Sequence, residues 1–231
     1  MKRKAKEIKK DKIKLVDIKQ FRFSPELEIE LPKKEDSQAL IERGKTLKGW
    51  EIKSDMTLDN GIELSPENSN HLYWNQESLM QIKEVLAIVR VHKGFINKKT
   101  CGLHIHVSTK GLSDKDVLKI INEWVHRQRY IVERFKINKG RLDDTCKLLP
   151  KEEINKLTEK QIHQFRNSDN YYLRTYGYID EKYYSLNVNH LPKHDYQTIE
   201  FRLFSGSVCY RDIKSVIYFV LNFIKDACER D

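Results

Sequence analysis

Two successive stretches of the chain show the same order of hydrophobic periodicities: one strand, one helix, two strands and a second helix. Segments in which apolar and polar residues alternate indicate strands, and apolar residues at a spacing of three to four indicate helices. The first stretch has strands predicted at 21–31, 49–55 and 61–66 and helices at 37–47 and 76–92. The second has strands at 102–108, 182–191 and 197–206 and helices at 113–135 and 211–229.

This order predicts an α+β fold in which two β-α-β-β-α units build one antiparallel sheet with helices on one face. Asp59, Asn60 and Gly61 predict a turn between the second and third strands. Ser113 is the expected N-cap of the helix that follows the fourth strand. The stretch 136–181 is only partly helical by pattern, chiefly over 150–165.

Charge and composition limit the class of protein. The net charge of +9 is concentrated in residues 1–14, which hold eight Lys or Arg against two acids. We therefore expect a basic N-terminal arm over 1–14, with nucleic acid as a possible partner, and a single catalytic domain over 15–231. No apolar run approaches the ~18 residues of a membrane helix, and the four scattered cysteines suggest neither a disulfide framework nor a zinc site. We expect a cytoplasmic protein without a membrane partner.

Strand parity predicts which side chains share the sheet face that the helices leave open. Successive residues of a strand point to opposite faces, so the apolar members of each strand face the helices and the alternating polar members face the other way. In "CGLHIHV" (101–107), for example, Leu103, Ile105 and Val107 point inward and both histidines outward. The outward set is Glu26, Glu28, Glu30, Glu63, His104, His106, Asn187, Asn189, Glu200 and Arg202.

This polar set suggests a site for divalent metal. An exposed sheet face ordinarily carries polar residues, but this one is rich in Glu and His and almost lacks Lys, Thr and Ser. Two carboxylates ~5 Å apart repel by about 3 kcal/mol at an effective dielectric near 20, so a group of them needs protons or cations. Oxygen ligands with a histidine suit Mg²⁺ or Mn²⁺. The arginine suggests an anionic substrate group held in a fork.

Four segments resemble the amidoligase family, which is related to the glutamine synthetase and glutamate–cysteine ligase superfamily of carboxylate–amine ligases. They are "ELEIE" (26–30), "WEIKSDMTLDNGIELSP" (50–66), "CGLHIHV" (101–107) and "YYSLNVNHLPKHDYQTIEFRLFSGSV" (183–208). The resemblance implies a glutamine synthetase-like fold and an ATP-dependent amide ligase that uses Mg²⁺ or Mn²⁺ and passes through an acyl phosphate. It does not identify the carboxylate and amine substrates.

The resemblance also implies roles for individual residues. The implied metal ligands are Glu28, Glu30, Glu63, His104 and Glu200. Asp55, His106 and Arg202 are the implied catalytic residues, with Arg202 on the transferred phosphoryl group and Asp55 facing substrate. His106, Asn187 and Arg202 are assigned to the nucleotide. Further substrate contacts are expected in the least similar stretch, from Arg166, Tyr172 and Arg174.

Two other classes of function remain open from the sequence. A metal-dependent hydrolase could use the same Glu and His residues with a metal-bound water and would turn over without ATP. A nucleic-acid-binding protein without enzymatic activity would depend on the arm at 1–14 instead. The positive charge favours an acidic or polymeric substrate in the ligase class, and the oligomeric state stays open. The chain has neither a G-x-x-x-x-G-K-[ST] nor a G-x-G-x-x-G motif, so an ATP site would have to be built on the sheet face.

Overall fold

The computed structural model describes residues 17–67, 71–167, 183–192 and 196–230, and the predicted arm at 1–14 lies outside them. The strands are β1 (Arg22–Glu30), β2 (Trp50–Asp55), β3 (Gly61–Pro66), β4 (Leu72–Tyr73), β5 (Gly102–Ser108), β6 (Leu186–Asn187) and β7 (Thr198–Ser205). The helices are η1 (Ile18–Gln20), α1 (Lys34–Gly44), α2 (Gln76–Val91), α3 (Asp114–Phe135), α4 (Lys139–Asp144), α5 (Lys151–Ile154), α6 (Glu159–Asn167) and α7 (Tyr210–Glu229).

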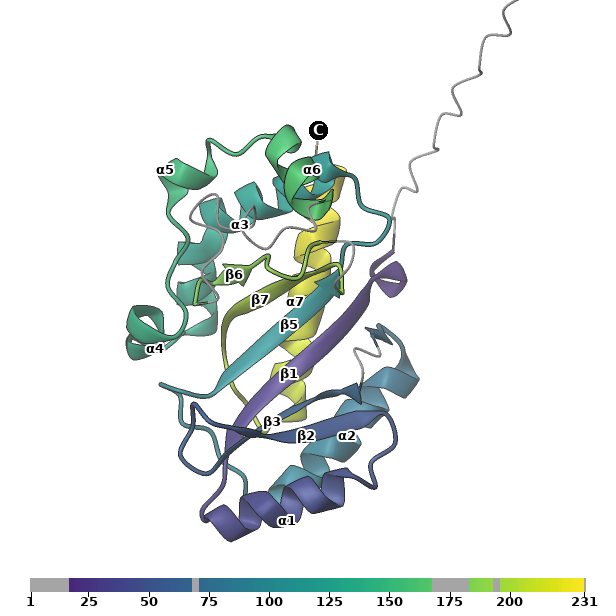
Figure 1. The fold of residues 1–231 in the computed structure, drawn as a ribbon, viewed down its shortest axis with the longest axis vertical. Helices are drawn as coiled ribbons and strands as arrows, with labels where there is room; N and C mark the ends of the chain where they lie inside the picture. The colour runs from purple at the N-terminus through teal and green to yellow at the C-terminus, as the bar shows by residue number, and fades with distance from the viewer. Residues whose placement is uncertain (1–16, 68–70, 168–182, 193–195, 231) are drawn as a thin grey trace, which may run out of the picture.

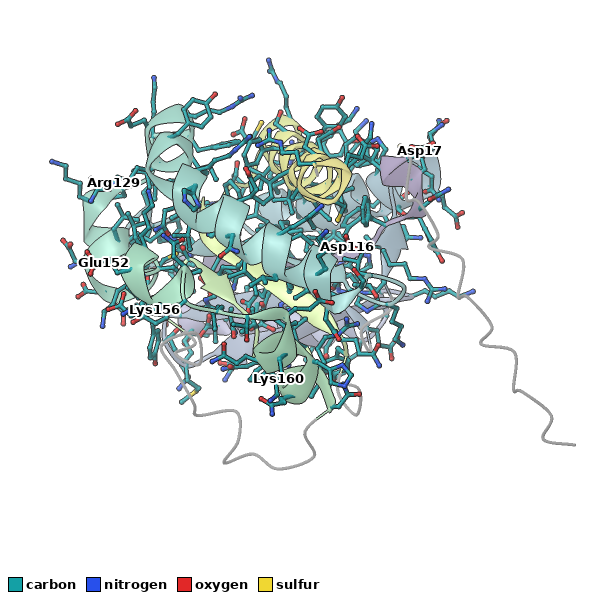
Figure 2. All side chains as sticks on the ribbon, turned by 90° about the horizontal axis from the view of Figure 1, so that it is seen from above. Asp17, Asp116, Arg129, Glu152, Lys156 and Lys160 are labelled. Carbon is teal, nitrogen blue, oxygen red and sulfur yellow. The ribbon has the colours of Figure 1, made fainter. Side chains whose placement is uncertain are left out.

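The predicted α+β fold is confirmed. All strand pairs are antiparallel, the strand order is β2-β3-β1-β5-β7-β6, and β4 pairs with the start of β1. The first strands of the two units, β1 and β5, therefore lie side by side at the centre of the sheet (Figure 1). In Figure 1, α7 passes behind the strands. In Figure 2, seen from above, α3 and α7 lie on the same side of the sheet, and labelled charged residues such as Arg129 and Glu152 point outward.

The inward-facing residues predicted by parity form the core. The inward residues of β1, β5 and β7, together with Leu31 just after β1, are at most 1% exposed: Leu27, Ile29, Leu31, Leu103, Ile105, Val107, Ile199, Phe201 and Leu203. Trp124 of α3 packs on this layer, with its ring 4.9 Å from that of Phe201 and 5.4 Å from that of Phe223 on α7. The buried apolar residues form one cluster.

Local signals fix the ends of several helices. Ser113 caps α3 as predicted: its hydroxyl accepts the Asp116 backbone N–H at 3.1 Å, and the Asp116 carboxylate accepts the Ser113 backbone N–H at 3.1 Å. Helix α1 begins three residues before the predicted position because its first turn is charged and exposed and so has no apolar stripe. None of the helices in the described part of the chain is long and apolar enough to cross a membrane.

The strand predicted over 182–191 is wrong in length, since β6 contains only two residues. On either side of β6, other hydrogen bonds replace the expected ladder: bonds to Lys147 before the strand and a bond to a side chain after it. The Asn187 side chain accepts the Asn189 backbone N–H at 2.9 Å, and Lys147 exchanges backbone hydrogen bonds of 2.7 Å with Tyr183 and Ser185. Asparagine side chains compete with strand pairing in this way.

A bulge interrupts β7 next to the open face. Leu103 of β5 pairs with Phe204, whereas Ile105 pairs with Phe201, so the register shifts by one residue between them. Two residues of β7, Arg202 and Leu203, therefore lie across from His104. Bulges of this kind bend a strand and redirect its side chains.

Candidate functional site

The open face carries a compact group of carboxylates and imidazoles at the centre of the sheet. Register brings it together: Glu26 of β1 lies opposite His104 of β5, and His106 lies opposite Glu200 of β7. His104 Nδ1 is 3.2 Å from Glu26 Oε2 and 3.3 Å from Glu200 Oε1. His106 Nε2 is 3.3 Å from the same Glu26 oxygen. We call Glu26, Glu28, His104, His106 and Glu200 the central cluster.

Three members of the central cluster present an arrangement that can hold a cation. One ligand atom from each of Glu26, His106 and Glu200 lies within 4.8 Å of the other two. Two carboxylates and one imidazole are a donor set suited to Mg²⁺ or Mn²⁺. The residues present therefore fit the metal that the sequence suggests.

Glu200 is the most firmly held carboxylate of the central cluster. It is 2% exposed, accepts the Asn187 side-chain N–H at 2.7 Å and accepts a hydrogen bond from Nη1 of Arg202. Burial raises the pKa of a carboxyl group, but the positive charges of His106 and Arg202 outweigh it and lower the pKa of Glu200. Glu200 is thus kept ionised, as a metal ligand must be.

Glu26 and His106 form a second charged pair. Burial works against ionisation of Glu26, yet hydrogen bonds with His104 and His106 hold the pKa of Glu26 well below its usual value. Burial would lower the pKa of His106, but the charges of Glu200 and Glu26 raise it.

Glu28 occupies the opposite side of His104 from Glu200. One oxygen of Glu28 accepts the Gly102 backbone N–H at 2.5 Å, and the other lies 3.6 Å from His104 Nε2. Arg141 of α4 reaches the same place. It is 1% exposed, and its Nη2 lies 3.3 Å from His104 Nε2.

Glu63 flanks the cluster on the side of Glu26. Burial and the negative charge of Glu26 raise the pKa of Glu63 to about 8. The positive charge of Lys53 on β2, whose Nζ lies 3.3 Å from Glu63 Oε1, opposes this rise in pKa. The same Nζ lies 3.5 Å from Glu51 Oε2. Glu26 is thus the ionised and Glu63 the protonated member of a neighbouring pair near neutral pH.

A cleft of about 310 Å³ opens beside Glu26, Glu63 and His106. Its wall also includes Glu51, Lys53, His71, His190 and Tyr196. The rings of His106, His190 and Tyr196 follow one another at centroid distances of 5.8 and 5.9 Å. Burial and the charge of His106 lower the pKa of His71 to about 4, so His71 is neutral near pH 7. The cleft gives a small molecule access to the central cluster.

The residues predicted from the sequence are only partly brought together. Glu28, His104, His106, Asn187, Glu200 and Arg202 lie in or against the central cluster, and Glu63 lies beside Glu26. Glu30 lies opposite Gly61, past the end of β5, and accepts a hydrogen bond from Thr100 at 2.9 Å. Asp55 accepts hydrogen bonds from Thr57 in the turn that follows β2.

None of the predicted substrate residues Arg166, Tyr172 and Arg174 is placed at the central cluster by the described part of the chain. Arg166 is 8% exposed and binds Asp114 at 2.8 Å and the Leu112 carbonyl at 3.0 Å, so it fastens α6 to the start of α3. Tyr172 and Arg174 lie outside the described residues.

Two residues of the site were missed as functional residues. Glu26 has the same parity as Glu28 and Glu30, so the strand offers two overlapping E-x-E pairs, and only the register with His104 favours the first. Arg141 lies on a six-residue helix without an apolar stripe, and no local pattern marks it.

Comparison with known proteins places the chain in a family. A family model described as "Putative amidoligase enzyme" matches residues 29–224. No curated protein matched the chain. The match covers most of the sequence, includes β5, β6 and β7 with their site residues, and begins just after Glu26 and Glu28. The chain therefore belongs to the amidoligase family.

Proposed function

We propose that this protein is an ATP-dependent carboxylate–amine ligase that forms an amide bond through an acyl phosphate on the open sheet face. The observation that carries the proposal is the central cluster: three carboxylates and two histidines, with Arg202 hydrogen-bonded to Glu200, beside an accessible cleft. Family membership supports a ligase in general, and the cluster supports ATP as the source of energy, because phosphoryl transfer depends on charge neutralisation and positioning.

The reaction has two steps. A carboxylate oxygen of the acid attacks the γ-phosphorus of ATP, and the bond to the bridging oxygen breaks to release ADP. The amine nitrogen then attacks the acyl carbon, phosphate leaves with the electron pair of the C–O bond, and the nitrogen loses a proton. Neither step needs a covalent bond to the protein, so the task of the protein is to align the groups and stabilise their charge.

Glu26, His106 and Glu200 would hold a Mg²⁺ or Mn²⁺ ion. Glu28 and Glu63, which lie opposite each other, are placed for a second ion, whose binding would displace the proton of Glu63. When bound, the metal would supply positive charge against the phosphate oxygens of ATP. Arg202, whose side chain is 16% exposed, would add a positive charge that is fixed by Glu200 before substrate arrives.

The cleft supports a site for the amine substrate. Even with Glu63 protonated, its acidic groups Glu26 and Glu51 outnumber its one lysine, Lys53. A cleft with this balance favours a cationic ammonium group over a second carboxylate. The acid and the phosphates of ATP would then approach from the side of Arg202.

The experiment is a screen for ADP formation by the full chain with Mg²⁺, ATP and pools of carboxylates and amines. For a pair that supports turnover, the acid is labelled with ¹⁸O in its carboxylate. Transfer of one ¹⁸O to phosphate is expected, because the oxygen that attacks ATP leaves with the phosphate. Metal-dependent cleavage of an amide in the absence of ATP would instead identify a hydrolase, and Glu200→Gln serves as the inactive control.

A further inference from the structure

We propose that Arg141 is a positioning residue that fixes His104 as the tautomer with its proton on Nδ1. In this form His104 donates toward Glu26 and Glu200 and sets the spacing of these two carboxylates, while His106 is the histidine that binds the metal. The metal part of this inference rests on the proposed function, whereas the tautomer can be measured in the metal-free protein.

The surroundings of Arg141 determine the state of His104 Nε2. Arg141 Nη1 donates to the Thr100 carbonyl at 3.0 Å, and Nη2 donates to the Arg202 carbonyl at 3.2 Å. Nη2 carries a second hydrogen and lies 3.3 Å from His104 Nε2. A guanidinium group has donors only, so Nε2 is the acceptor in this contact. The nearest Glu28 oxygen, at 3.6 Å, is too far from Nε2 to be its hydrogen-bond acceptor.

The other nitrogen of His104 then holds the proton. Nδ1 lies between Glu26 Oε2 at 3.2 Å and Glu200 Oε1 at 3.3 Å, two oxygens that can only accept when ionised. His104 is 2% exposed, so its ring is held in place by packing as well as by these contacts. A protonated Nδ1 and an Nε2 occupied by Arg141 leave no lone pair for a metal.

His106 differs in this respect. Its Nε2 is the nitrogen that faces both carboxylates of the possible metal group, at 3.3 Å from Glu26 Oε2 and 3.8 Å from Glu200 Oε1. Its Nδ1 lies 3.4 Å from the Thr198 hydroxyl, a partner that can accept a proton. The pattern of a ligating nitrogen on one side and a hydrogen-bond partner on the other is typical of metal-binding histidines.

Gly102 provides the space in which Arg141 meets His104. A Cβ atom at this position would lie 2.2 Å from Arg141 Nη2, 2.6 Å from His104 Nε2 and 2.8 Å from Glu28 Oε2. These separations are far below van der Waals contact, so any side chain would push the guanidinium away from the imidazole. Gly102→Ala therefore removes the contact without changing a charge.

The deciding experiment is NMR of the metal-free full chain with ¹⁵N-labelled histidine, in which long-range ¹H–¹⁵N correlations report the protonation of each ring nitrogen. His104 is expected with a protonated Nδ1 and an unprotonated Nε2, assigned through the loss of its signals in His104→Asn. Gly102→Ala and Arg141→Met, each checked for folding by circular dichroism, should change this signature and leave that of the distant His163 unchanged. A wild-type His104 with a proton on Nε2 would overturn the proposal, even if neither variant folds.

Calorimetry with Mn²⁺ alone separates the roles of the two histidines. In His104→Asn the side-chain amide keeps a donor near the position of Nδ1, so we expect affinity to fall by less than about tenfold, the low end for a lost outer partner. The matched variant His106→Asn loses a ligand, and its affinity should fall by more than about 100-fold, beyond the range for outer partners. Equal losses in the two variants would contradict the assignment. If the wild type did not bind Mn²⁺, the metal site of the proposed function would fail, and the tautomer would still decide the role of Arg141.

Discussion

The stability of the metal-free protein should fall as the pH rises from about 6.5 to about 8, because of Glu63. The pKa of Glu63 is raised from 4.5 to about 8 in the folded protein. Between these values the folded state holds a proton that the unfolded chain has lost, so raising the pH favours unfolding by up to about 1.4 kcal/mol per pH unit. From pH 6.5 to 8 the upper limit is about 2 kcal/mol. The observed loss will be smaller to the extent that the side chain of Glu63, 24% exposed, is solvated.

The other groups near the site with shifted pKa values set the pH range over which this loss of stability is seen. The pKa of His71 is lowered to about 4, so between pH 4 and 6.5 the unfolded chain holds a proton that the folded protein lacks, and stability rises with pH. This effect opposes that of Glu63, so the free energy of unfolding is expected to change little with pH just below pH 6.5. The raised pKa of His106 adds to the loss above pH 6.5. Glu26 and Glu200 have lowered pKa values, so their contributions are lost only below the ordinary range of a glutamate.

The assay is urea unfolding across this pH range in the presence of a chelator. Glu63→Gln should be more stable than the wild type at the alkaline end and should lose less stability with rising pH. Glu51→Gln is the matched control, because Glu51 also contacts Lys53 but has a side chain that is 50% exposed. If Glu63→Gln and the wild type lose the same free energy of unfolding between pH 6.5 and 8, the argument about Glu63 is wrong.

Three further predictions test other parts of the account. Arg202→Lys should lower kcat for ADP formation by roughly 10²–10³, with little change in melting temperature. Lysine keeps the charge but not the fork that contacts Glu200 and that we propose also contacts the phosphoryl group. Unchanged kcat in a folded variant would refute the role. Trp124→Ala should cost about 3–5 kcal/mol of stability in urea unfolding, since the indole packs on Phe201 and Phe223 and donates to Ser185 at 3.0 Å. Tyr218→Ala, 51% exposed on α7, is its control, and similar losses in both would contradict the packing argument. Deletion of residues 1–14 should leave the melting temperature nearly unchanged and weaken any salt-sensitive binding to a polyanion; a large loss of stability would mean that the arm is docked.

The fold was predictable because its signals are local. Alternation along β1, β5 and β7 separates residues such as Leu27 from Glu28 whatever lies next to the strand, and the turn at Asn60, whose φ is +53°, needs only its own residues. The pattern over 182–191 misled because alternation continues through Asn187 and Asn189, whereas the Asn187 side chain accepts the Asn189 backbone N–H and the ladder with β7 ends at Asn187.

The site depends on contacts between residues of different strands and helices, which no single segment of the sequence shows. Parity places Glu26, Glu28 and Glu30 on one face, but a shift of register between β1 and β5 would exchange their roles, and only the pair of Glu26 with His104 settles it. Arg141 enters the site from a short helix in the stretch with the weakest pattern, and its contacts arise from tertiary packing alone.

The central claim is that the open face of the sheet is a metal-dependent nucleotide site. The most direct test is calorimetric binding of a non-hydrolysable ATP analogue to the wild type and to Glu200→Gln, each with Mg²⁺ and with a chelator. The account predicts binding by the wild type that requires Mg²⁺ and is lost in Glu200→Gln, while the variant stays folded. Binding that is equal with and without Mg²⁺, or unaffected by the loss of the Glu200 carboxylate, would contradict it.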